Sequence, residues 1–361
     1  MSWRLSRFRA GDWVIVRNEA EILSTLDDRG CVDGLPFMPE MLQYCGRKMR
    51  VRAVAHKTCE TALKTWQGRR LETTVHLEDA LCDGSAHGGC QADCSLFWKD
   101  VWLAPADRPT PLQPPANASG LSAGQLLTLT ILPAVPGEPL SYTCQATQLY
   151  NATTPLAWWD LRQYWRDVVT RNHSLKHVLS VLWNAVAKHT VRRTPVGYRL
   201  LKSLRERTHR WLTGREVPDY GGMIPPGQRT PQVHSCLKPG DYVRVKSKEE
   251  IAKTLDMNSR NRGLSFDPEM AVYCGRIFRV RRCVTEILDE QTGKMVAMKN
   301  PCIMLEGALC SAQYSECRLL CPRALPPYWR EIWLEKIEVE SAVGLTPAVA
   351  QEMPHSAETH S

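Results

Sequence analysis

The chain carries one sequence motif twice, and this repeat constrains the fold more than any other feature. Residues 11–52 and 240–281 align without a gap, and both contain the run Tyr-Cys-Gly-Arg. The match continues to a Trp-x-x-x-Trp-Leu sequence that closes each copy. Each copy spans roughly 100 residues, which is the size of one domain. The repeat therefore indicates a duplicated domain and not a solenoid, whose shorter units fold only when stacked.

The pattern within each copy predicts mainly β structure. Val14 and Val16 alternate with other residues directly after Gly-Asp, which is typical of a strand that follows a turn. In the second copy, Gln-Thr-Gly-Lys at 291–294 separates two apolar pairs and predicts a hairpin turn. Several short strands within about 100 residues favour a small β-barrel or a strongly bent sheet.

The middle of the chain has a different character. Leu127 to Leu132 alternates and predicts one strand, whereas Pro155 and Asp160 are consistent with the start of a helix. Apolar residues at helical spacing over 175–186 predict a helix, and a second one is expected from Tyr198 to Leu212.

We therefore predict an α+β chain, mainly β with an α-helical middle, in which two homologous small β-barrel-like domains flank a helical segment. The expected parts are a first β domain at 1–103, a proline-rich linker at 104–120, a mostly helical and basic segment at 121–213, a Gly/Pro linker at 214–235, a second β domain at 236–340 and a disordered tail at 341–361.

Composition bears on the compartment. No run approaches 18 apolar residues, which predicts no transmembrane segment. The start of the chain, MSWRLSRFRAGDW, lacks the apolar core of a secretory signal. We expect a cytoplasmic protein, in which thiols stay reduced.

The net charge of +8 is concentrated in the middle. Residues 160–216 hold thirteen Lys or Arg against four Asp or Glu, with tryptophans nearby. Arg192, Arg193, Trp158 and Trp159 are the candidate partner-binding residues. Such a mixture can bind nucleic acid or an anionic surface, but an aromatic core with a solvated basic face is the simpler interpretation, so a protein partner is favoured.

The cysteines give the strongest chemical signal. Eight of the fourteen recur between the copies, four in each: Cys45, Cys82, Cys90, Cys94, Cys274, Cys310, Cys317 and Cys321. Four thiolates are what a closed tetrahedral zinc site requires, so the pattern predicts about two zinc ions per chain. Buried apolar thiols and an iron–sulfur cluster remain alternatives. His87 could replace one ligand, but because the second copy has no histidine there, we expect a loop residue.

Other candidate chemistry is weaker. Glu40 and Glu269 recur within Pro-Glu-Met, where we expect surface acids or caps more than catalytic carboxylates. The sequence holds no phosphate-binding Gly-rich loop, no Gly-x-Ser-x-Gly elbow and no dinucleotide fingerprint.

The chain resembles a group of uncharacterised bacterial proteins with a duplicated cysteine-containing unit. The motifs are Gly-Leu-Ser-Phe-Asp-Pro-Glu-Met at 263–270, Tyr-Cys-Gly-Arg at 273–276, Asn-Pro-Cys-Ile-Met-Leu-Glu-Gly at 300–307 and Tyr-Trp-Arg-Glu-Ile-Trp-Leu at 328–334. This resemblance implies no activity. The opening Gly-Asp-x-Val-x-Val is also similar to small barrels of the Src-homology-3 type, including that of nitrile hydratase β subunits, which bears on the fold alone.

Two functions follow from these observations. The first is a non-enzymatic, metal-stapled interaction or scaffold protein with tandem small β domains. The alternative is a metal- or thiol-dependent enzyme, or a maturation factor, in bacterial specialised metabolism. Symmetry separates them, because structural metal sites should be alike in both copies whereas catalysis needs one site with an open position.

Overall fold

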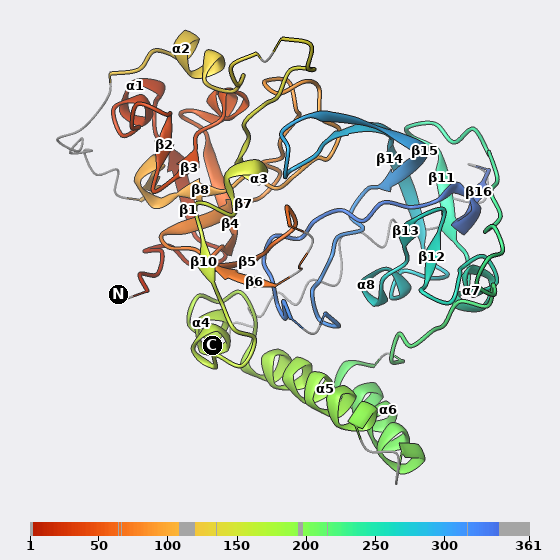
Figure 1. The fold of residues 1–361 in the computed structure, drawn as a ribbon. Helices are drawn as coiled ribbons and strands as arrows, with labels where there is room; N and C mark the ends of the chain where they lie inside the picture. Colours follow the sequence, from red (N-terminus) through yellow and green to blue (C-terminus); the bar gives the residue numbers. More distant parts are fainter. Residues whose placement is uncertain are drawn as a thin grey trace. The chain divides into compact units, whose positions relative to one another are not determined.

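The computed structural model describes residues 3–338 except 64, 66, 108–119, 135, 194–197, 215 and 316, and only the backbone of 191–193 and 198–201. Most of the predicted proline-rich linker and all of the predicted tail lie outside the described residues. Helices and strands are mixed, so the α+β class is confirmed (Figure 1). The chain divides into two compact units. Unit 1 combines the residues up to His173 with Glu286–Ala297 and Cys321–Ala324, and unit 2 contains the rest.

Unit 1 is built on a five-stranded antiparallel sheet. Its strands are, in spatial order, β8 (Trp98–Lys99), β7 (Thr74–Leu77), β4 (Lys48–Val54), β1 (Trp13–Val16) and β9 (Leu103–Pro105). The predicted first strand is confirmed as β1, whose Val14 and Val16 are fully buried while Trp13 is exposed. The alternation therefore places one face of this strand in the core.

Smaller elements surround this sheet. A second sheet joins β10 (Thr154–Pro155), β6 (Gly68–Arg70) and β5 (Lys57–Cys59), and β2 (Cys31–Val32) pairs with β3 (Leu35–Pro36). The helices are α1 (Glu19–Leu23), α2 (Ala123–Thr128), α3 (Gln145–Gln148) and α4 (Arg162–Val169), with 3-10 turns η1 (Pro39–Tyr44) and η2 (Asp100–Trp102).

A four-stranded sheet has the order β15 (Met295–Leu305), β14 (Ile277–Leu288), β11 (Tyr242–Val245) and β16 (Leu334–Ile337). Its residues belong to unit 2 except Glu286–Ala297 at the β14–β15 hairpin, which belong to unit 1. The predicted hairpin turn between β14 and β15 is confirmed, and it is closed by the Asp289 N–H, which donates to the carbonyl of Lys294. The other elements are α5 (Leu175–Arg193), α6 (Tyr198–Thr213), α7 (Lys248–Ala252), β12 (Arg260–Asn261), β13 (Leu264–Ser265), α8 (Pro268–Ala271) and η3 (Glu331–Trp333).

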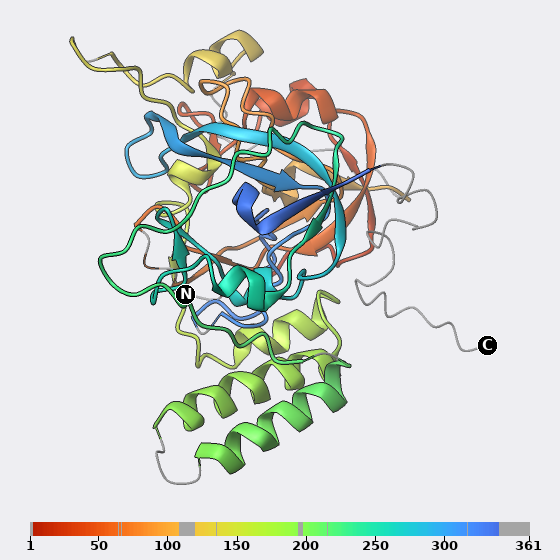
Figure 2. The same ribbon diagram turned by 90° about the vertical axis from the view of Figure 1, so that its right-hand side faces the viewer.

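The two predicted long helices are confirmed as α5 and α6, which lie side by side (Figure 1, Figure 2). Two other expectations for the middle are wrong. Leu127 falls in helix α2 and not in a strand, because Ser122 and Gln125 form a capping box that fixes the start of a helix. The helix start expected at Pro155 and Asp160 is wrong for Pro155, which lies in strand β10, whereas Asp160 accepts from the N–H of Arg162, where helix α4 begins.

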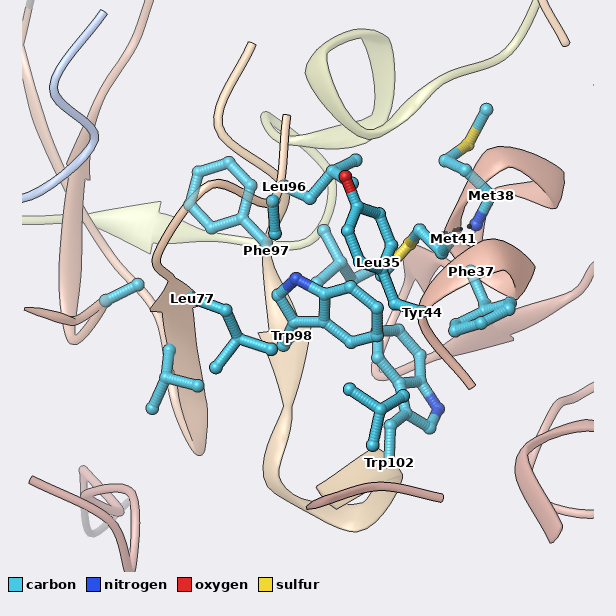
Figure 3. Packing of buried hydrophobic residues seen from close by; sticks show 14 of the residues in the cluster. Leu35, Phe37, Met38, Met41, Tyr44, Leu77, Leu96, Phe97, Trp98 and Trp102 are labelled. Atoms are coloured by element: carbon cyan, nitrogen blue, oxygen red, sulfur yellow. Dashed lines mark hydrogen bonds between the residues drawn. The ribbon is translucent and has the colours of Figure 1, made fainter. Parts of the chain in front are cut away.

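An aromatic cluster fills the core of unit 1 (Figure 3). Phe37 meets Trp102 edge to face with ring centroids 5.1 Å apart, and Tyr44 meets Trp98 in the same way. The indole N–H of Trp102 donates to the hydroxyl of Thr25 over 3.1 Å. This bond satisfies the one polar atom that the buried indole carries.

The core of unit 2 contains the equivalent contacts at the aligned positions. Phe266 meets Trp333 with ring centroids 5.2 Å apart, and Tyr273 packs on Trp329. The indole N–H of Trp333 donates to the hydroxyl of Thr254 over 3.0 Å. The residues that recur in the sequence thus make the same kinds of contact within each unit.

Candidate metal centre

Three metal-ligating side chains of unit 1 converge on one point. Glu40 comes from η1, Cys82 follows β7, and His87 lies in the loop that leads to Cys90. The Cys82 thiol donates to Oε1 of Glu40 over 3.2 Å, and its Sγ lies 3.5 Å from Nε2 of His87. The other ring nitrogen of His87, Nδ1, lies 3.3 Å from the same Glu40 oxygen.

The two distances from Cys82 fit a shared metal ion, which would bind only one of the two ring nitrogens of His87. Zinc bonds of 2.0–2.3 Å in a tetrahedron place neighbouring donor atoms about 3.5 Å apart. One ligand atom from each of Glu40, Cys82 and His87 lies within 4.8 Å of the other two. No other such group of three or more occurs within the ranges that the structure describes. This cluster can therefore hold a metal ion.

The cluster also holds polar atoms that the protein leaves unsatisfied. Glu40 is 6% exposed and His87 is 2% exposed, so water cannot solvate either group freely. Oε2 of Glu40 and Nδ1 of His87 are buried without a hydrogen bond of acceptable geometry. Because an unsatisfied buried polar atom costs about 1–3 kcal/mol, a ligand that binds both groups would remove a real penalty.

The sequence prediction for Glu40 and Glu269 was a surface acid or a cap, and the prediction for His87 was a loop residue. The surface position is wrong for both glutamates, because both are buried. His87 does lie in a loop, but its side chain is buried as well. The recurrence of the glutamate within Pro-Glu-Met was the available signal for Glu40. For His87 the sequence offered only its place between Cys82 and Cys90.

A metal that binds this cluster must displace protons from its ligands. Burial raises the pKa of Cys82, and the neighbouring Glu40 carboxylate raises it further, so without a metal this thiol stays protonated. Burial lowers the pKa of His87, but Cys90 and Glu40 outweigh that effect and raise it to about 9. For Cys90, burial is overcome by His87, and the pKa of the thiol is lowered.

A cavity of about 30 Å³ adjoins the cluster. Its lining includes His87, Glu290, Arg323 and four cysteines, which are Cys82, Cys90, Cys94 and Cys144. Its volume is about that of one water molecule. Burial raises the pKa of Cys94 to about 12, so this thiol, like that of Cys82, is neutral at physiological pH.

An ion pair and hydrogen bonds hold two of the residues that line the cavity. Arg323 is buried and forms an ion pair with Glu290 over 3.2 Å. Its Nη1 also donates to the hydroxyl of Thr61, which in turn donates to Glu290. Truncation of any one of these three groups would leave the others partly unsatisfied.

The loop that carries His87 depends on one glycine. Gly84 has a φ of +76°, and a Cβ built on it would lie 2.1 Å from the carbonyl oxygen of Cys90. The backbone segments before and after His87 therefore approach more closely than any side chain permits. Gly89 also has a positive φ, of +74°, but has open space around it.

The second copy builds a different site around the equivalent acid. Glu269 is buried, but its oxygens accept hydrogen bonds from the hydroxyls of Ser311 and Ser315 and from the N–H of Tyr314. Ser315 follows Cys310 by five residues, as His87 follows Cys82. The carboxylate that faces a thiol and an imidazole in unit 1 is thus satisfied by hydroxyls and an amide in unit 2.

The eight predicted thiol ligands are distributed unevenly. In the first set, Cys82, Cys90 and Cys94 line the cavity, whereas Cys45 is half-buried and does not. In the second set, Cys274 and Cys310 are half-buried and Cys317 is exposed. Cys321 is buried and belongs to unit 1, while the other three of its set belong to unit 2.

The candidate partner-binding residues fall in both units. Trp158 and Trp159 lie in unit 1 and meet edge to face with ring centroids 6.0 Å apart, and Trp159 is 67% exposed. Arg192 and Arg193 end helix α5 in unit 2, where only the backbone is described.

Comparison of the chain with protein-family models, curated proteins and solved structures gives no match. Within the described part of the chain, no helix is both long enough and apolar enough to cross a membrane.

Proposed function

We propose that unit 1 binds one zinc ion through Glu40, Cys82 and His87. The observation that carries this proposal is the convergence of a carboxylate, a thiol and an imidazole, with one donor atom from each within 4.8 Å of the other two. Mixed oxygen, nitrogen and sulfur ligands suit zinc better than calcium or magnesium, which take oxygen. Cys90, which lines the same cavity and interacts with His87, is the proposed fourth ligand, and its thiol must move toward the other three to bind the ion.

The ion acts as a structural staple in a non-enzymatic interaction protein. Four protein ligands close the coordination sphere, and a cavity that holds one water leaves no room for a substrate. The ligands come from η1 and from the loop after β7, so the ion joins two segments that are distant in sequence. Metal binding to such a site contributes directly to folding free energy.

The two β units are, in this proposal, copies of one small-barrel domain. Support comes from the matching contacts in the two cores, where Thr25 with Trp102 corresponds to Thr254 with Trp333. Only the first copy carries the thiol and imidazole beside its buried glutamate. One zinc per chain is therefore expected in place of the two that the cysteine pattern predicted.

A second candidate is a zinc-dependent enzyme. Three ligands and a water-sized cavity beside them are also what a catalytic zinc needs, and the difference between Glu40 and Glu269 favours a specialised first copy. In this alternative Cys90 stays unligated and the metal holds a water.

Metal analysis and cobalt substitution distinguish these candidates. Protein purified without added metal should contain about one zinc per chain, and the absence of any bound metal after purification with zinc present would refute both. Cobalt(II) in a closed site with two thiolates should give strong thiolate-to-metal absorption that azide does not change. An azide-sensitive spectrum with weaker thiolate absorption indicates an exchangeable water and the enzyme.

A protein is the proposed partner, with nucleic acid or an anionic surface as the alternative that the basic segment supports. Binding to a polyanion should weaken steeply with salt because counterions are released. Replacing Arg192 and Arg193 with Glu should reduce both the affinity for nucleic acid and its salt dependence. Wild-type protein that binds neither nucleic acid nor anionic vesicles at low salt leaves the protein partner.

A further inference from the structure

Unit 2 contains a larger cavity, of about 220 Å³, whose lining includes two arginines. Arg262 comes from the turn between β12 and β13, and Arg330 directly precedes η3. The cavity also borders Asn300, His234 and Glu331. At roughly 30 Å³ for each molecule of liquid water, it could hold several waters or one small organic molecule.

Arg330 is a buried cation without an acidic partner. Only 9% of the residue is exposed, and among the described residues no carboxylate forms an ion pair with it. Its guanidinium donates instead to the carbonyls of Asn261, Arg262 and Asn300. These bonds fix the position of the charge but do not neutralise it, so the cavity has a positive potential.

Arg262 leaves the donors at the tip of its side chain available. Its backbone has a φ of +47°, which is uncommon for a residue with a side chain. The strained position is held by Thr230, whose hydroxyl accepts from the Arg262 N–H and whose carbonyl accepts from Nε over 2.7 Å. The two terminal nitrogens make no hydrogen bond within the described part of the chain.

Glu331 does not cancel this charge. Its carboxylate accepts from the N–H of Ser235 and pairs with neither arginine. Two guanidinium groups against one carboxylate leave the lining with a net positive charge. Because like charges repel, two adjacent arginines are stable together when an anion lies between them.

We propose that this cavity binds a small organic anion through a phosphate or carboxylate group. Arg262 supplies the forked donors that such a group accepts, and Arg330 supplies a fixed positive charge beside them. The volume exceeds what a simple inorganic anion needs, so the group is carried on a small molecule. This site shares no residue with the zinc cluster and does not depend on it.

The test is calorimetric titration of the full-length protein with inorganic phosphate and, separately, with succinate, at constant ionic strength. Arg262→Gln should weaken binding at least about tenfold, because it removes a charge-assisted hydrogen bond. Arg260→Gln is the matched control: it removes the same charge from an exposed residue in the same hairpin and should leave affinity unchanged.

Each outcome decides the proposal. Binding of phosphate alone assigns a phosphate ester, and binding of succinate alone assigns a carboxylate; both support the site if Arg262→Gln weakens them and Arg260→Gln does not. No binding of either anion at about 10 mM, or equal binding by wild type and Arg262→Gln, overturns it. A circular dichroism spectrum shows whether each variant is folded.

Discussion

Lys57 donates to Oδ2 of Asp167 over 2.6 Å, and both side chains are buried. The pair joins strand β5 to helix α4 within unit 1. Burial raises the pKa of Asp167, Lys57 lowers it in part, and the result is about 6. This carboxyl therefore binds its proton more tightly in the folded chain than in the unfolded chain, whose value is near 3.8.

The sign of the resulting pH dependence follows from that difference. A raised folded pKa stabilises the fold fully below pH 3.8, and this contribution is lost as the pH rises through about 6. In Asp167→Asn the slope of unfolding free energy against pH between about 4 and 6 should change by up to about 1.4 kcal/mol per unit. Urea unfolding across this range measures it, and an unchanged slope would contradict the assignment.

The same linkage fixes the sign of the effect at neutral pH. Because the fold favours the protonated carboxyl, Asp167→Asn, which mimics that form, should unfold at a higher urea concentration than wild type above pH 6. Lys57→Met removes the cation that lowers the pKa of Asp167 and should instead destabilise the fold. A lower urea midpoint for Asp167→Asn than for wild type at pH 7 would contradict the raised pKa.

Metal binding should depend on one copy only. Glu40→Gln and Cys82→Ser should each weaken metal affinity at least about tenfold. Glu269→Gln and Cys310→Ser make the same chemical changes at the aligned positions and should leave the metal content unchanged. Elemental analysis after dialysis against a weak chelator measures this. Equal loss of metal in both pairs of variants would restore the symmetrical two-site prediction.

The loop that carries His87 should tolerate a methyl group at Gly89 but not at Gly84. Gly84→Ala places a Cβ against the carbonyl of Cys90 and should abolish metal binding by displacing His87. Gly89→Ala has the same sign of φ but open space, so only the backbone preference of about 1 kcal/mol is lost. Similar metal content in the two variants would show that the close approach does not shape the site.

Each core should lose a similar free energy when its indole loses a hydrogen-bond partner. Thr25→Val leaves the Trp102 N–H unsatisfied, and Thr254→Val does the same to Trp333. We expect each change to cost about 1–3 kcal/mol. Tryptophan fluorescence during denaturant unfolding measures both, and Thr25→Ser and Thr254→Ser, which keep the hydroxyl, should be milder.

The sequence predicted features that arise from local periodicity and missed those that need a tertiary partner. Helices α5 and α6 follow from apolar spacing, and strand β1 from alternation. Helix α2 was missed because its capping box at Ser122 outweighs the alternation that follows. The burial of Glu40 and His87 was missed because it depends on the residues that pack against these side chains. Such tertiary contacts cannot be read from a single sequence.

Recurrence between the copies was informative about packing, whereas the metal role that it predicts for the recurring thiols stays a prediction. Residues that appear twice, such as Trp102 and Trp333, make equivalent core contacts. The candidate site depends instead on a difference, the histidine at 87 against the serine at 315. An alignment of the two copies that is judged by identical residues gives most weight to the four shared thiols and least to this histidine.

Unit 1 is assembled from chain segments that are distant in the sequence, and this has a consequence for its biosynthesis. The N–H of Leu288 donates to Sγ of Cys90, and Arg323 closes the cavity beside the cluster. A ribosome that has completed Cys82, His87 and Cys90 must still translate nearly all of unit 2 before these two residues exist. The cavity beside the cluster therefore cannot be completed until Arg323 has been translated. A chaperone or a metal supplied early in translation would act in that interval.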